Sequence, residues 1–163
     1  MSKNKLNVEI NGTQLVLTRE FDAPREKVFA AHTDCRHLMK WWGTRTFPLT
    51  YCNMDFRVGG RWHYRMTGPE GMESWGLSEY KEIKEPELLV YTDSFSDKDG
   101  NINTAFPSTT IRTEFIDQGG RTMIRTTANY GSAEDIQKLV DMGMIAGITE
   151  TMEMLEEYLA TQQ

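Results

Sequence analysis

The sequence predicts an α+β fold in which one antiparallel sheet carries segregated helices. Short apolar runs with strand-like alternation dominate residues 46–128. Two brief helical segments precede this region, and one long amphipathic segment follows it. Strands that alternate singly with helices would predict a parallel sheet instead, and this chain lacks that pattern.

Length and composition are those of an ordinary globular protein. At 163 residues, we expect one domain over residues 1–163. No run of 18 apolar residues predicts a membrane span, and the lysines of MSKNKLNVEING precede no apolar stretch typical of a secretory signal. We therefore expect a cytoplasmic protein. A net charge of −6 without a basic patch argues against a nucleic-acid partner.

The first predicted element is a β-hairpin. LNVEINGTQLVLTREF contains two alternating runs around Asn11-Gly12, which is a strong hairpin signal. One long strand with a bulge at Gly12 is the alternative.

Two short helices are then expected. Asp22 is predicted to cap the first, with Pro24 in its first turn, so that Asp22→Ala would cost about 1 kcal/mol of stability. Asp34 is predicted to cap the second helix, CRHLMKWW, which Gly43 ends.

Five or six strands follow between Thr46 and Ala128. In RWHYRMT, Trp62, Tyr64 and Met66 alternate with Arg61, His63 and Arg65, which places the apolar set on one face. The preceding RVGG is interpreted as a tight turn, because it opens no helix and lacks a phosphate-loop spacing.

The last predicted element is a single helix that begins at Ser132 and runs to about Leu159. Glycine destabilises a helix interior, yet Gly143 and Gly147 both lie within this segment. Four methionines accompany them, and unbranched thioethers adapt to irregular contents. Either the helix approaches the sheet closely at the glycines, or room is left there for a ligand. The helix alone does not decide between these alternatives.

No motif for metal binding or nucleophilic catalysis is present. The three histidines lack metal-site spacing, and no G-x-S-x-G motif occurs. We expect no metal site, no cofactor and no assigned catalytic residue. Cys35 and Cys52 form no C-x-x-C pair and are interpreted as reduced thiols.

Two segments resemble a known family. TREFDAPREKVFAAHTDCRHLMKWWG is similar to the opening of the SRPBCC (START/Bet v 1-like) superfamily, in the branch named for activators of the heat shock protein 90 ATPase. Its matching residues are Arg19, Phe21, Ala23, Pro24, Val28, Phe29, Ala31, Thr33, Trp41, Trp42 and Gly43. In DFRVGGRWHYRMTGPEG, they are Asp55, Arg57, Gly59, Gly60, Met66, Gly68, Pro69 and Gly71.

The resemblance implies a helix-grip fold, in which a curved antiparallel sheet wraps around a long C-terminal helix and encloses a cavity, with two short helices after the first strand. A small hydrophobic or amphipathic molecule is then the expected partner. The candidate ligand-binding residues are Trp42, Phe47, Trp62, Tyr64, Met66, Trp75, Met144, Ile148 and Met152.

The resemblance also implies two alternative functions. One is co-chaperone activity in the stress response, with heat shock protein 90 as the partner and Trp41-Trp42-Gly43 as the docking region; the further N-terminal domain of the eukaryotic co-chaperone is not expected in 163 residues. The other is catalysis like that of polyketide cyclases or dehydratases, for which Asp93, Arg112 and Tyr80 are candidates. Their facing depends on a strand register that the sequence does not fix.

Overall fold

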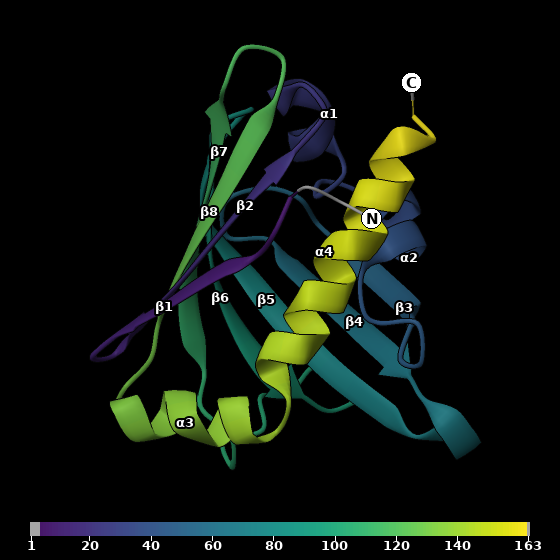
Figure 1. The fold of residues 1–163 in the computed structure, drawn as a ribbon. Coiled ribbons are helices and arrows are strands. Elements are labelled where there is room, and N and C mark those ends of the chain that lie inside the picture. The colour runs from purple at the N-terminus through teal and green to yellow at the C-terminus, as the bar shows by residue number, and fades with distance from the viewer. Residues whose placement is uncertain (1–3, 163) are drawn as a thin grey trace.

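An eight-stranded antiparallel sheet forms the body of the protein in the computed structural model, which describes residues 4–162 (Figure 1). The strand order is β1-β2-β8-β7-β6-β5-β4-β3. The strands are β1 Asn7–Asn11, β2 Gln14–Phe21, β3 Leu49–Met54, β4 Arg61–Thr67, β5 Glu73–Lys84, β6 Leu88–Ser96, β7 Thr109–Asp117 and β8 Thr122–Asn129. The α+β prediction is confirmed.

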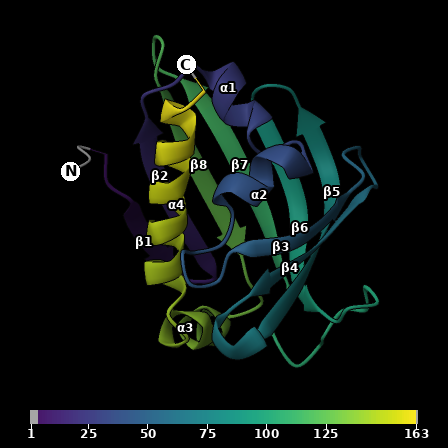
Figure 2. The same ribbon diagram turned by 90° about the vertical axis from the view of Figure 1, so that its right-hand side faces the viewer.

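The helices gather on one side of this sheet, and α4 lies across its face (Figures 1 and 2). The helices are α1 Arg25–Ala30, α2 Cys35–Trp41, α3 Ala133–Asp141 and α4 Met144–Ala160, with a 3₁₀ turn at Pro69–Gly71. This is the helix-grip arrangement. Within residues 4–162, no helix combines the length and apolar character needed to cross a membrane.

The predicted N-terminal hairpin is confirmed. Asn11 pairs with Gln14, so Gly12 and Thr13 form the two-residue loop, and Gly12 has a φ of 61°. The turn therefore lies one residue later than Asn11-Gly12, and the two short helices follow the second strand of the hairpin instead of the first.

The predicted Asp22 cap is wrong, whereas the Asp34 cap is confirmed. Pro24 occupies the N-cap position of α1 with extended backbone and no side-chain cap, so α1 begins too late for Asp22 to reach its amides. Asp22 instead accepts a hydrogen bond of 2.8 Å from Arg121, an exposed ion pair whose loss costs about 0–1 kcal/mol. At α2, the Arg36 amide donates to Asp34 Oδ1 at 2.7 Å.

The predicted single C-terminal helix is also wrong, because Gly143 divides it. Ser132 caps α3 by accepting a hydrogen bond from the Asp135 amide at 3.1 Å. Gly143 then has a φ of 92°, a left-handed conformation that ends α3 and lets α4 start in a new direction. In Figure 1, α3 accordingly lies across the end of α4.

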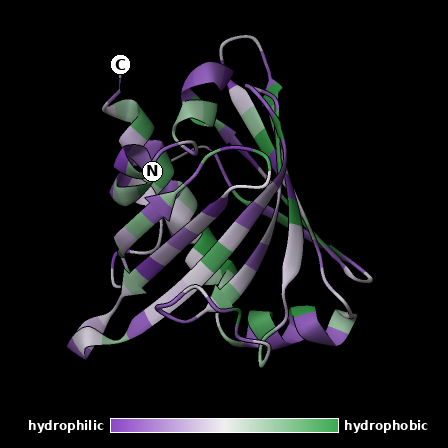
Figure 3. Ribbon diagram, turned by 180° about the vertical axis from the view of Figure 1, so that it is seen from behind, coloured by the Kyte–Doolittle hydropathy of each residue, from purple (hydrophilic) through white to green (hydrophobic). Residues whose placement is uncertain are grey.

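The core lies where the C-terminal half of α4 meets the sheet and the two short helices. Leu155 and Leu159 of α4 are buried, as are Phe29 of α1 and Trp41 of α2. The Trp41 indole donates to the Ala31 carbonyl at 3.0 Å, so this buried polar group is satisfied. Apolar and polar positions alternate along the strands in Figure 3, as expected for a sheet with one covered face.

Cys35 and Cys52 form a disulfide, so the prediction of reduced thiols is wrong. Their α carbons lie 5.8 Å apart, within the usual range for a disulfide. The pair joins α2 to β3, the sheet edge on which α2 packs. A separation of 17 residues gives no sign of this contact, which arises only when α2 folds back.

The two glycines at the start of α4 should respond oppositely to alanine. Gly143→Ala should lower the free energy of unfolding by about 1–2 kcal/mol, because alanine is strained at positive φ. Gly147→Ala should raise it by about 0.5–1 kcal/mol, because Gly147 is helical and a β carbon there meets only Thr44 at 4.0 Å. Urea denaturation of both variants checks the pair. Equal effects would contradict the helix break.

Removing the disulfide by a Cys35→Ala, Cys52→Ala double substitution should lower the free energy of unfolding by about 3 kcal/mol, the value typical of a loop of this size. Denaturation of the oxidised protein provides the measurement. A reducing agent should bring the wild type down to the variant's stability and leave the variant unchanged. Insensitivity of the wild type to reduction would refute the predicted contribution.

Candidate functional site

A cavity of about 450 Å³ lies between α4 and the inner face of the sheet. Alternate residues of the strands point into it, because successive side chains of a strand face opposite sides. The sheet contributes Leu15, Leu17, Thr18, Arg19, Tyr64, Met66, Ser74, Trp75, Gly76, Tyr91, Asp93, Ser94, Phe95, Thr109, Ile111, Thr113, Ile124, Thr126 and Ala128. The wall is thus mainly apolar, with a few polar groups.

The helical side of the cavity begins at the two glycines. A β carbon at Gly143 would meet nothing within 4 Å, and one at Gly147 would meet only Thr44 Cγ2 at 4.0 Å. The glycines therefore leave space and do not mark a close approach of α4 to the sheet. Ala146, beside them, is exposed.

The methionines of this region divide into two groups. Met142, Met144 and Met152 border the cavity, whereas Met154 packs against the buried core. Ile148 lies between Met144 and Met152 on the lining face, so the sequence correctly grouped these three.

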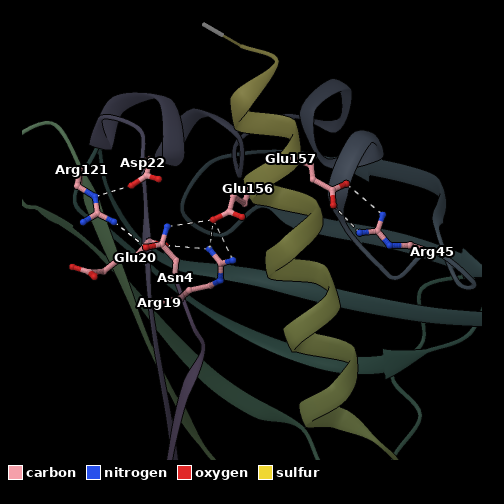
Figure 4. Close-up of polar contacts among 8 residues, drawn as sticks. All are labelled: Asn4, Arg19, Glu20, Asp22, Arg45, Arg121, Glu156 and Glu157. Atoms are coloured by element: carbon pink, nitrogen blue, oxygen red, sulfur yellow. Dashed lines mark hydrogen bonds and ion pairs between the residues drawn. The ribbon is translucent and has the colours of Figure 1, made fainter. Parts of the chain in front are cut away.

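Ion pairs on both sides of α4 hold its C-terminal half in place (Figure 4). On one side, Glu156 lies 3.4 Å from the buried Arg19 of β2. On the other side, Glu157 pairs with Arg45 at 2.8 Å. Thr151 adds a hydrogen bond to the Gly43 carbonyl. These contacts tie α4 to β2 and to the segment after α2 at the border of the cavity, which Arg19, Gly43 and Thr151 line.

Asp93 forms the centre of a polar cluster in the cavity wall. The Tyr64 hydroxyl and the Ser78 hydroxyl each donate to Asp93 Oδ1 at 2.9 Å. The register places Ser78 directly opposite Asp93 on neighbouring strands. Burial raises the pKa of Asp93 to about 6, although these hydrogen bonds act in the opposite direction.

Gly76 gives Tyr64 the room to reach Asp93. Tyr64 pairs with Gly76 across β4 and β5, and a β carbon at Gly76 would lie 2.3 Å from the tyrosine ring. The ring therefore lies over a position without a side chain. Burial, followed by the charge of Asp93, raises the pKa of Tyr64, so its hydroxyl stays a donor.

His32 borders the cavity from the segment after α1. Its Nδ1 lies 2.9 Å from the Val28 carbonyl, and its ring contacts Trp41 and Phe115 edge-on. Burial lowers the pKa of His32 to about 4, so the imidazole is neutral at neutral pH. Among residues 4–162, no group of three or more His, Cys, Asp or Glu side chains could hold a metal ion.

Most of the candidate ligand-binding residues come together at the cavity. Those that border it are Trp42, Tyr64, Met66, Trp75, Met144, Ile148 and Met152. Trp62 instead stacks behind Tyr64 at 4.3 Å, and Phe47 packs over Gly68. The ring of Trp75 stacks on His63 at 4.9 Å, so this residue adds little aromatic surface to the lining.

The three candidate catalytic residues separate. Asp93 borders the cavity, Tyr80 is buried in the core against Phe56, and Arg112 is exposed on β7. Sequence reasoning missed Ser78, and it missed the role of Gly76. An isolated glycine inside a strand is a signal of close approach by another group, and that signal was available at Gly76.

Comparison with known proteins finds a family and solved structures that match most of the chain. The sequence profile described as "Activator of Hsp90 ATPase homolog 1-like protein" matches residues 22–160. A solution structure of a protein from Arthrobacter aurescens is 30% identical, with a TM-score of 0.88, and the match covers 95% of this chain and 91% of that one. A crystal structure from Mycobacterium smegmatis is 33% identical, with a TM-score of 0.84 and coverage of 94% for both chains. No curated protein matched.

The raised pKa of Asp93 predicts a pH-dependent penalty on stability. Since the folded pKa of about 6 exceeds the ordinary value of 3.8, the folded state binds the proton more tightly, and stability is lost as pH rises through this window. The free energy of unfolding of Asp93→Asn, measured relative to that of the wild type, should therefore rise by up to about 3 kcal/mol between pH 4 and pH 7. Denaturation of both proteins across this range tests it, and parallel curves would contradict it.

Proposed function

Because the chain belongs to the family of activator of Hsp90 ATPase homolog 1-like proteins, whose fold has the capacity to bind ligands, we propose that it binds a small hydrophobic or amphipathic molecule between α4 and the sheet. The observation that carries this proposal is the cavity of about 450 Å³. Its volume falls within the range typical of small-molecule sites, and its mainly apolar wall with a few convergent polar groups is typical of them.

The composition of α4 supports this proposal further. A helix that served only to complete the core would place a large aliphatic side chain over the sheet at its first turn, yet the helical residue Gly147 borders the space. Met144 and Met152 can adjust their rotamers to different contents. Keeping such a space costs stability, because a cavity forgoes packing contacts. A ligand that fills the space would restore these packing contacts.

Surface docking on heat shock protein 90 through Trp41-Trp42-Gly43 has less support. Trp41 is fully buried, and Trp42 packs edge-on against Trp62 at 4.9 Å while it borders the cavity. Trp41 therefore offers no surface to a partner protein, and the half-buried Trp42 is already engaged with Trp62. This region stabilises the cavity wall instead.

Acid-base catalysis on a bound molecule is a second candidate, favoured by one observation. Asp93 borders the cavity with its pKa raised to about 6 by burial, and a carboxyl group with a pKa near neutrality suits general acid or base chemistry. In this case Asp93→Asn would abolish turnover of a bound molecule while the molecule still bound.

Gly147→Leu tests the binding function directly. Its side chain should occupy the space beside Thr44 and weaken binding of a neutral fluorescent probe, N-phenyl-1-naphthylamine, about tenfold or more. Leucine is a better helix former than glycine, so the variant should fold. Fluorescence titration provides the measurement, and native mass spectrometry of the freshly purified protein would detect a molecule that co-purifies.

Ala146→Leu is the matched control. Ala146 is the neighbouring residue on α4, it is exposed, and it does not border the cavity, so leucine there should leave probe binding unchanged. Unchanged affinity in a folded Gly147→Leu variant would refute the proposed function. Equal weakening by both variants would show that the probe binds the helix surface.

A further inference from the structure

The charges around the cavity do not balance. Among the cavity-lining residues in the described part of the chain, Asp93 is the only carboxylate. Arg19 also borders the cavity, but Glu156 lies 3.4 Å from its guanidinium and balances its charge. His32 is neutral at neutral pH. The cavity therefore presents one unbalanced charge, which is negative.

The groups that face Asp93 are neutral. Both side chains that donate to it, Tyr64 from β4 and Ser78 from β5, bond to Oδ1. Across residues 4–162, no lysine, arginine or histidine forms an ion pair or hydrogen bond with Asp93, and no side chain donates to Oδ2. The backbone amide of Ser94, which is also neutral, hydrogen-bonds the carboxylate as well. The other titratable groups that sense its charge are tyrosines, namely Tyr80, Tyr91 and Tyr130.

An ionised carboxylate in an apolar wall without a cationic partner is unfavourable in free energy. A ligand that brought a cation to Oδ2 would remove this cost, because it would form a charge-assisted hydrogen bond in a medium of low dielectric constant. An anionic group at the same place would add a second negative charge. A neutral donor would satisfy the oxygen without balancing the charge.

Building on the proposed ligand-binding function, we propose that the cavity selects amphipathic molecules with a protonated amine, which donates a hydrogen bond to Asp93 Oδ2, and that it disfavours molecules with a carboxylate head. The apolar part of the ligand would lie along Met144, Ile148 and Met152 of α4. The amine would lie on the sheet side, at the cluster of Asp93, Tyr64 and Ser78.

Three probes with the same chain and different heads test the selection: decylamine, decan-1-ol and sodium decanoate. Isothermal titration calorimetry at about pH 7.5 should give the tightest binding for decylamine, about tenfold tighter than decanol, with decanoate the weakest. As pH falls through about 6, the advantage of decylamine should shrink, because Asp93 takes up a proton while the amine keeps its own.

Asp93→Asn should remove the advantage of decylamine over decanol and strengthen the binding of decanoate. The control is Glu26→Gln, which removes one negative charge from the exposed face of α1 and should leave the order of the three probes unchanged. If this control also lost the preference, the net charge of the protein would explain it, and the assignment to Asp93 would be overturned.

The remaining outcomes separate this inference from the function on which it rests. Equal binding of the three probes, or tightest binding of decanoate, would overturn the amine selection while leaving a ligand cavity that Gly147→Leu still blocks. Both proposals would be overturned if none of the three probes bound and if Gly147→Leu left the fluorescence titration of N-phenyl-1-naphthylamine unaltered.

Discussion

The position of α4 is the constraint on which the rest of the structure depends. Leu155 and Leu159 anchor its C-terminal half in the core, and the ion pairs of Glu156 and Glu157 hold that half from both sides. Its N-terminal half starts at Gly143, whose left-handed conformation sets the direction of the helix. The C-terminal half of α4 therefore completes the core, and its N-terminal half covers one side of the cavity.

Because the C-terminal half of α4 is anchored in the core, the protein can stay folded with a cavity beneath the N-terminal half. A cavity lined by apolar side chains lowers stability, since the lining atoms lose contacts that a filled core would supply. The buried end of α4 and the disulfide that ties α2 to β3 lie outside the cavity and offset that loss. Stability and ligand capacity thus come from different halves of α4.

Local patterns predicted those parts of the structure that depend on neighbours in sequence. Alternation along β4 correctly placed Trp62 and Tyr64 on one face, which is buried, and the Asp34 cap and the helix start at Ser132 were predicted correctly. The facing of β5 could not be predicted, because the register shifts between Tyr80 and Glu82 and the inward positions change parity there.

Long-range contacts explain the other errors and the missed part of the site. The disulfide and the opposition of Ser78 and Asp93 join residues whose proximity depends on the folded sheet. Once that sheet is formed, the position of Asp93 has a chemical consequence. Coulomb interactions strengthen as the dielectric constant falls, so one carboxylate in an apolar cavity has more influence on the choice of ligand than the many charges at the surface. In the proposed binding site, the space that α4 leaves open would decide which shapes fit, and Asp93 would decide which charge is favoured.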